Sequence, residues 1–450
     1  MKGVITNISN FLTRFFLELN QNNVQYAVLR NYKSLPYSSN GSDIDMWVCK
    51  TDSAKCINIL VNVSKVSALS LVSYYGDSTA IKVCLQNETD GVQFDIFLGA
   101  IYYKDKILVP GESIINNTIS YNEILAVNDD YSKLLALIKE LINNGRVNNK
   151  YIEPILSNKH CYSYNYLAQH FSNFNSIFLQ KLYRSIEESS IGEDANELAT
   201  FCKASLSAKD KTNKVNILIS KIKRLFWKKT GYHIVVEGTD GSGKSFIINS
   251  ITPILNGGFH NGIVYNHLRP HFIPDIAELL GKRKKSSTES KIVVSNPHAE
   301  NPSGFIGSLI RWSYYLIDYT WGYLMKIWLP LHSKSKVFIF DRYYYEYYFD
   351  QRRSRVNLPI WIIRFGELLI SKPDIILCLG GDSKKIYARK PETSLEEVTR
   401  QTIKLKDFCN NRDNTVWIDT TTTPEESINL AMHAILKMMS DRFNFNDIIK

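Results

Sequence analysis

The sequence predicts an α/β protein in which a smaller mixed α+β domain precedes a parallel sheet with helices on both faces. Two observations support this prediction. The chain has 450 residues, which is too long for one hydrophobic core and predicts two or three domains. In residues 231–450, short apolar runs alternate with helical patterns, and this alternation is typical of a parallel sheet.

Three segments are expected: a mixed α+β domain at 1–150, a helical connector at 151–230 and an α/β domain at 231–450. In the first segment, apolar periodicity predicts helices at 5–23, 52–66 and 121–145, and strands at 24–30, 44–49, 69–75, 80–86 and 92–98. In the last segment it predicts strands at 233–237, 337–341 and 374–379, and helices at 304–326, 357–370, 394–410 and 424–440.

The stretch 304–330 is apolar enough to be tested as a membrane span. It contains Arg311, Asp318 and Lys326, and each charge would cost roughly 2.5–3.5 kcal/mol at the centre of a bilayer. We therefore expect a buried helix of a soluble domain. The N-terminal residues lack the apolar core and cleavage site of a secretory signal, so a cytoplasmic protein is expected.

The formal net charge of +10 fits an anionic ligand, such as nucleotide phosphates, a phosphorylated acceptor or an anionic membrane surface. It is equally typical of a mildly basic protein without such a ligand, and we expect no nucleic-acid partner. Residues 214–229 form a basic amphipathic pattern, which predicts either an interdomain connector or a peripheral membrane contact through Phe226 and Trp227. The seven cysteines show no metal-binding spacing and are interpreted as reduced thiols.

A glycine-rich motif follows the predicted strand at 233–237. Residues 238–245 read Gly-Thr-Asp-Gly-Ser-Gly-Lys-Ser, which matches the pattern GxxxxGK[ST] of a phosphate-binding P-loop. The glycines let the backbone aim its N–H groups at phosphates, Lys244 reaches the outer phosphates, and the Ser245 hydroxyl is a ligand for Mg²⁺. The motif predicts that a nucleoside triphosphate is bound by Gly238, Asp240, Gly241, Ser242, Gly243, Lys244 and Ser245.

A second acidic motif ends the predicted strand at 337–341. Asp341 and Arg342 lie at its carboxyl end, where ligands bind in doubly wound sheets. Asp341 is therefore placed to hold Mg²⁺ through water or to orient an acceptor, and Arg342 offers donors that suit a phosphate. The alternative interpretation of this pair is a surface ion pair.

Two sequence motifs, EGTDGSGKS (237–245) and FDRYYYEYYFD (340–350), together resemble the thymidylate kinase family. The resemblance implies ATP and Mg²⁺ as cofactors, a catalytic role for Lys244, Asp341 and Arg342, and dTMP as the default acceptor. It also implies that Asp240 contacts an acceptor sugar hydroxyl, that Tyr343 contacts the substrate, and that the protein is a homodimer. YARKPETSLEEVTRQ (387–401) falls where that family has its lid. There Arg389, Lys390 and Arg400 are candidates to neutralise transition-state charge, with a solvated helix face as the alternative.

The acceptor region departs from that family and contains HLRPHFIPDI (267–276) and NPHAENPSG (296–304). Arg269 and Arg311 are the candidate clamps for an anionic acceptor. Arg352, Arg353 and Arg355 form either a second anion site or a surface patch. These segments resemble thymidylate-kinase-like proteins of bacterial surface-polysaccharide loci, so the alternatives are a kinase of a sugar or glycan intermediate and a nucleotide-gated binding module without an acceptor.

Three aspartates in the first segment form a candidate metal site. Asp43 and Asp45 lie two residues apart on a predicted strand and point to one face, and Asp95 lies within another strand. Three such carboxylates suit two Mg²⁺ ions in nucleotidyl transfer, and the pattern resembles the nucleotidyltransferase superfamily. The turn Arg30-Asn31-Tyr32 lacks the Gly-Ser pair of active members. Active transfer, binding without catalysis and unrelated aspartates all remain as interpretations, and Arg30 is the expected anion contact in the first two.

Overall fold

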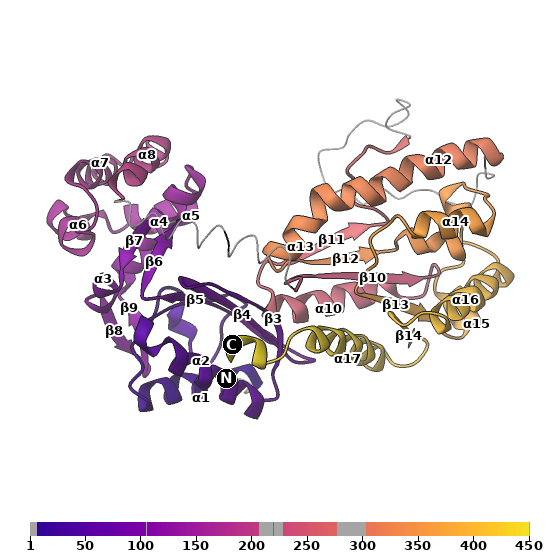
Figure 1. Cartoon of the computed structure of the whole chain (residues 1–450), viewed down its shortest axis with the longest axis horizontal. Helices are drawn as coiled ribbons and strands as arrows, with labels where there is room; N and C mark the ends of the chain where they lie inside the picture. Colours follow the sequence, from indigo (N-terminus) through magenta and orange to yellow (C-terminus); the bar gives the residue numbers. More distant parts are fainter. Residues whose placement is uncertain (1–6, 105, 207–218, 220–227, 277–302, 450) are drawn as a thin grey trace. The chain divides into compact units, whose positions relative to one another are not determined.

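The computed structural model describes residues 7–104, 106–206, 219, 228–276 and 303–449. The chain forms two compact units, Met1–Phe226 together with Phe443–Lys450, and Trp227–Arg442 (Figure 1). Apart from residues 219, 228 and 229, the predicted amphipathic helix at 214–229 lies outside the described residues, as does most of 296–304.

The first unit is built on a mixed seven-stranded sheet. Its strands lie in the order β3 (Ser70–Gly76), β4 (Ala80–Gln86), β5 (Gly91–Leu98), β2 (Ile44–Val48), β1 (Tyr26–Val28), β9 (Ile124–Val127) and β8 (Thr118–Tyr121). A separate hairpin is formed by β6 (Ala100–Tyr103) and β7 (Lys106–Pro110). The parallel pairing of β2 with β5 places Asp45 beside Asp95.

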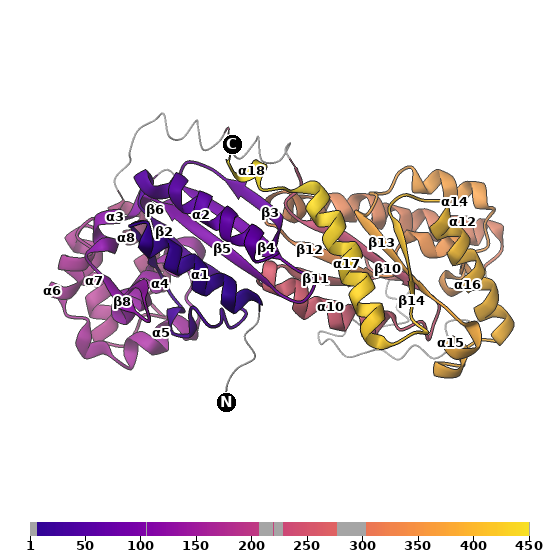
Figure 2. The ribbon, with the colours of Figure 1, turned by 90° about the horizontal axis from the view of Figure 1, so that it is seen from below.

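Helices cover both faces of this sheet. On one face α1 (Asn7–Gln21) and α2 (Ser53–Val66) lie side by side (Figure 2) and share a core with Phe443 and Ile448 from the end of the chain. The other core contains residues of α4 (Asp129–Asn144), α5 (Asn149–Leu156), α6 (Tyr164–His170), α7 (Ser176–Glu187) and α8 (Ala195–Ser205). The helices after residue 150 therefore pack into the first unit.

The predicted helix at 121–145 is wrong in its first two turns. Residues 118–127 form the β8–β9 hairpin, whose turn places Asn122 and Glu123 at φ values of 46° and 62°. Two successive positive φ angles are typical of a hairpin turn that matches strand twist. The helix begins at Asp129 because the Asn128 side chain accepts the N–H of Tyr131 at 2.9 Å and caps it.

The second unit is built on a five-stranded sheet that is parallel throughout. Its strands lie in the order β11 (Ile263–His267), β12 (Val337–Asp341), β10 (Tyr232–Gly238), β13 (Ile375–Gly380) and β14 (Thr415–Asp419). On one side lie α10 (Lys244–Gly258) and α17 (Pro424–Arg442), and on the other lies α12 (Phe305–Ile317) (Figure 1). The α/β class predicted from the alternation is confirmed.

The helix α12 continues, with wider π-type hydrogen bonding, through η4 (Asp318–Trp328) into α13 (Leu329–Ser333). The remaining helices are α14 (Ile360–Glu367), α15 (Ser383–Arg389) and α16 (Leu395–Asn410). Asp318 is fully buried and pairs with Arg269, so one side of the segment 304–330 packs in the core of the second unit, whereas Ile306 and Ile310 on its other side are exposed. Within the described part of the chain, no helix is long and apolar enough to cross a bilayer.

A buried histidine makes the second unit sensitive to acid. Burial lowers the pKa of His233 to about 4, and both ring nitrogens lack a hydrogen-bond partner. The unfolded chain binds this proton near pH 6.5, so the stabilising effect of neutral His233 is complete above that pH and is lost as the pH falls towards 4. We expect the free energy of unfolding to fall by up to about 1.4 kcal/mol per pH unit in that window.

Urea unfolding followed by tryptophan fluorescence measures this effect, because six of the seven tryptophans lie in the second unit. The control is His233→Leu, which keeps a side chain of similar volume and cannot be protonated. A variant with the same acid sensitivity as the native protein would contradict the assignment.

Candidate functional site

The P-loop connects β10 to α10 in a conformation that needs glycine. Gly241 and Gly243 have φ values of 81° and 85°, which L side chains rarely adopt. A Cβ on Gly241 would lie 2.6 Å from the Ile386 carbonyl oxygen, and one on Gly238 would collide with the Ser242 hydroxyl. The sequence motif therefore forms a tight backbone loop that ends at the N-terminus of α10, where N–H groups and the helix dipole favour an anion.

Lys244 lies beneath this loop. Its Nζ donates to the carbonyl oxygens of Gly238 and Thr239, at 2.9 Å each. Burial, followed by the nearby charge of Arg342, lowers the pKa of Lys244 to about 8. Ser245, the next residue, is exposed at the start of α10. The ammonium is thus held by two carbonyl oxygens of the loop, which phosphate oxygens can replace.

Asp341 lies directly beside the P-loop strand. β10 and β12 pair in parallel with Val236 opposite Asp341, so the loop and the second acidic motif leave the same edge of the sheet. The Asp341 carboxylate is 3.4 Å from the Tyr265 hydroxyl and 3.7 Å from His267 Nδ1. Burial opposes ionisation of Asp341, but His267, Lys244 and Arg342 together lower its pKa to about 2. It is an anion at neutral pH.

Arg342 is the centre of a buried charge network. Its side chain is 2% exposed, and its guanidinium donates to Glu346 and, at 2.7 Å, to Asp240. Arg353 donates to the second oxygen of Asp240 at 2.6 Å. Burial opposes the ionisation of Asp240, but Arg342, Lys244 and Arg353 lower its pKa far below the usual range. Asp240 therefore positions two guanidinium groups beside the P-loop.

Five buried polar atoms around this loop have no hydrogen-bond partner among the described residues. They are Glu237 Oε2, Thr239 Oγ1, Ser242 Oγ, Asp341 Oδ1 and Glu346 Oε2. Buried polar groups are normally paired, so such a cluster indicates a place for a polar ligand or ordered water. The carboxylate and hydroxyl oxygens of Asp341, Thr239 and Ser242 are hard donors that fit a nucleotide with Mg²⁺.

Two residues predicted to contact the substrate are buried in the core of the second unit. Arg269 is 5% exposed, donates to Asp318 and Asp275, and stacks 4.8 Å from the centre of the Tyr315 ring. Tyr343 is fully buried, and its hydroxyl is directed to the Ser371 carbonyl at 3.4 Å. Both side chains have internal partners in this structure, and the predicted acceptor contacts stay predictions.

The predicted cations outside the loop lie on or next to α12, α15 and α16. Lys390 lies against the loop, since a Cβ on Gly241 would be 3.3 Å from its Cβ. Arg389 is exposed and donates to the Thr420 carbonyl at 2.8 Å, and Arg400 pairs with Glu397 on its own helix. Arg311 lies on α12, where its buried Nε has no partner in the described structure.

Three charged residues of this network, two carboxylates and one cation, are not predicted from the sequence to act together. Glu237 and Glu346 were not selected, and Arg353 was assigned only to an anion site or a surface patch. Burial and the charge of Glu346 raise the pKa of Glu237 well above its usual value. One signal was available: Glu346 lies four residues after Arg342, and its side chain pairs with it.

The first unit brings its three predicted aspartates together. Oxygens of Asp43, Asp45 and Asp95 lie within 4.8 Å of one another. Asp45 and Asp95 are opposite each other on paired strands, and Lys82 lies opposite Asp95 on the next strand. Burial, partly offset by Lys82, raises the pKa of Asp95 to about 6, and Asp95 Oδ1 has no partner among the described residues.

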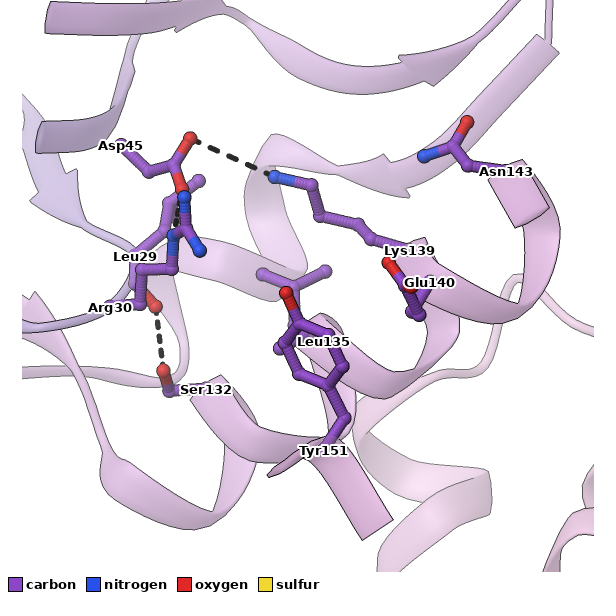
Figure 3. A pocket seen from close by; sticks show the side chains of 10 residues that line it. Leu29, Arg30, Asp45, Ser132, Leu135, Lys139, Glu140, Asn143 and Tyr151 are labelled. Carbon is purple, nitrogen blue, oxygen red and sulfur yellow. Dashed lines mark hydrogen bonds and ion pairs between the residues drawn. The ribbon is translucent and has the colours of Figure 1, made fainter. Parts of the chain in front are cut away.

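Cations already neutralise part of this cluster. Arg30 donates to Asp45 and, at 3.0 Å, to Asp43, and Lys139 reaches Asp45 at 3.8 Å from α4. Arg30, Asp45 and Lys139 line a pocket of about 180 Å³, with Tyr151 from α5 on its wall (Figure 3). The arrangement can bind a cation through the aspartates or an anion through Arg30 and Lys139.

No protein-family model and no curated protein sequence matches this chain. Among solved structures, a thymidylate kinase from Ehrlichia chaffeensis aligns with 46% of this chain and 99% of its own length, at 19% sequence identity and a TM-score of 0.30. A likeness at this level defines neither the fold nor the function of the chain.

Proposed function

We propose that the second unit is an ATP- and Mg²⁺-dependent phosphotransferase of the thymidylate kinase-like type, with a nucleoside monophosphate as its acceptor and dTMP as the first candidate. The observation that carries the proposal is the convergence of the P-loop, Asp341 and Arg342 at one edge of the parallel sheet. Five unpartnered buried polar atoms at that edge support a polar ligand there.

Each residue has a distinct part in this proposal. The loop N–H groups and Lys244 hold the phosphates of the donor. Lys244 exchanges its carbonyl partners, Gly238 and Thr239, for oxygens of the phosphoryl group that is transferred. Ser245 and Asp341 would hold Mg²⁺, which neutralises charge on the phosphates when bound. Arg342 and Arg353, fixed by Asp240, offer donors to the acceptor and to the developing charge.

The acceptor side supports an anionic molecule more than a neutral one. Asp240 accepts from the guanidinium groups of Arg342 and Arg353, so its present contacts position these two cations. Two neighbouring guanidinium groups are suited to phosphate. A phosphorylated sugar or glycan intermediate has the same chemistry and is the alternative acceptor.

An acceptor screen with γ-labelled ATP tests the proposal. The full-length protein is incubated with dTMP, other nucleoside monophosphates and sugar phosphates, and labelled products are separated. Labelled dTDP as the product supports the proposal. Label that appears only on a sugar phosphate would show that the acceptor is the sugar phosphate and not dTMP. ATP binding without a product from any acceptor would favour the nucleotide-gated binding module instead.

A second function is proposed for the first unit, where the clustered aspartates favour divalent-cation binding of the kind used in nucleotidyl transfer. Mn²⁺ binding to the full chain, followed by electron paramagnetic resonance, tests it. Asp45→Asn is expected to lose this binding, while the exposed control Glu193→Gln keeps it.

Arg30→Gln is expected to strengthen Mn²⁺ binding, because Arg30 donates to two of the three carboxylates. Equal Mn²⁺ binding in all four proteins would rule out the site.

A further inference from the structure

One buried carboxylate of the second unit binds several donors of a single loop. Asp318 is fully buried at the start of η4. Its carboxylate accepts the backbone N–H groups of His271, Phe272 and Ile273 at 3.1, 2.7 and 3.3 Å. It also accepts from the guanidinium group of Arg269. A single side chain thus fixes the backbone of this loop and one of its side chains.

The helix α12–η4 holds residues 268–275, which we name the anchored segment, at further points. Lys326 Nζ donates to two carbonyl oxygens of the segment. Gly322 leaves room for the segment, because a Cβ there would lie 2.9 Å from Phe272 Cβ and 3.0 Å from Pro270 Cβ. The segment is therefore tied to one helix through its N–H groups, its carbonyl groups and its packing.

The anchored segment begins at the edge of the sheet where the P-loop and Asp341 lie. β11 and β12 pair in parallel with His267 opposite Asp341, and the Leu268 N–H donates to the Asp341 carbonyl oxygen at 3.0 Å. Ligands of doubly wound sheets bind at this edge. The side chains of His271 and Phe272 are exposed on the segment. The position of the segment therefore makes it a candidate wall for a ligand that lies beside Asp341.

The presence of a charge at position 318 favours a specific role over a general contribution to stability. Trp312, Tyr319 and Tyr323 of the same helix are core residues. Taking a carboxylate out of water among such residues is costly, and well-packed apolar side chains in its place are often at least as stabilising. An apolar side chain cannot accept three backbone N–H groups, so the carboxylate supplies a fixed path for the anchored segment.

We propose that Asp318 is a positioning residue for the acceptor, because it holds the anchored segment as a preformed wall of the acceptor site. The inference rests on the proposed function, in which the acceptor lies beside Asp341 and Arg342. Asp318 acts only through the segment and does not touch the reacting groups. Phosphoryl transfer depends on positioning, and a displacement of about 1 Å can cost about 10²-fold in rate.

Steady-state kinetics of full-length Asp318→Asn with ATP tests the proposal. The acceptor is dTMP, or the sugar phosphate that the acceptor screen identifies in its place. Asparagine keeps the size of the side chain and removes its charge and one acceptor oxygen. The KM for the acceptor is expected to rise about 10–10²-fold, while kcat changes by less than about threefold. The affinity for ATP from calorimetry is expected to stay the same, because the P-loop is not altered.

A second variant and a matched control separate positioning from stability. Gly322→Ala displaces the anchored segment without removing a charge, and it is expected to raise the same KM. The control is Asp374→Asn, which alters another carboxylate of this unit whose side chain is only 8% exposed. Asp374 pairs with Lys229 and Arg442, outside the segment and the P-loop, so this variant is expected to lower the melting temperature and leave the KM unchanged.

Hydrogen exchange followed by mass spectrometry shows whether each variant loosens residues 268–275. Faster exchange there with an unchanged acceptor KM would overturn the proposal, and so would an equal rise of KM in Asp374→Asn, which would assign the effect to stability. If Asp318→Asn does not fold, the KM of Gly322→Ala provides the test. A native protein that binds ATP and phosphorylates no acceptor would contradict the proposed function itself, and this inference with it.

Discussion

Replacing Lys244 with alanine is expected to reduce phosphoryl transfer by about 10²–10³-fold or more, since a positioned charge that stabilises the transition state contributes on that scale. The side chain is held by the carbonyl oxygens of Gly238 and Thr239 in the P-loop. The fold is expected to remain, because the substitution removes a buried ammonium whose burial already lowers its pKa to about 8.

The measurement compares turnover of the native protein and the variant in the acceptor screen, with ATP affinity from calorimetry and the melting temperature as separate readings. Lys384→Ala is the matched control, because Lys384 is exposed on α15 and lies outside the loop. Unchanged turnover in Lys244→Ala would contradict the proposed mechanism, and a loss of equal size in both variants would assign the effect to net charge.

The parts of this site that are local in sequence could be predicted. The P-loop needs glycine at fixed positions within eight residues, and Gly241 and Gly243 do adopt positive φ values. The position of Asp341 at a strand end was also predictable, because a short apolar run ends there. The pairing of its strand β12 with β10 could not be derived from the local sequence, since the order of strands in the sheet depends on packing between segments about a hundred residues apart.

Long-range pairing explains why the sequence does not reveal the contacts that Arg269 makes in the structure. Arg269 is predicted to clamp an anionic acceptor because a guanidinium group suits an anion. The sequence does not show that it pairs with Asp275, six residues later, and with Asp318. Its partner Asp318 is 49 residues away, in a segment whose apolar character predicted burial but not a buried carboxylate. In the first unit, residues 121–127 are predicted as helix although they belong to the β8–β9 hairpin, because the helical pattern of α4 begins one residue after that hairpin.

Replacing Arg342 with methionine is expected to lower the free energy of unfolding of the second unit by about 3–5 kcal/mol, the usual cost of removing one member of a buried ion pair. The loss would leave Glu346, which is 1% exposed, without its closest cation, and Asp240 with Arg353 alone. The matched control is Arg400→Met, which breaks an exposed arginine–glutamate pair worth about 0–1 kcal/mol.

The dependence of this penalty on pH distinguishes the electrostatic contribution of Arg342 to stability from its packing contribution. Burial raises the pKa of Glu346, and without Arg342 that pKa would rise further, so lowering the pH from 7 to 5 would protonate the carboxyl and remove much of the uncompensated charge. The penalty of Arg342→Met is therefore expected to shrink at pH 5, and Glu346→Gln added to the variant is expected to recover part of it at pH 7. Urea unfolding followed by tryptophan fluorescence measures both effects. A penalty that is the same at both pH values and in the double variant would mean that Arg342 stabilises this unit by filling space, and that the charge network contributes nothing.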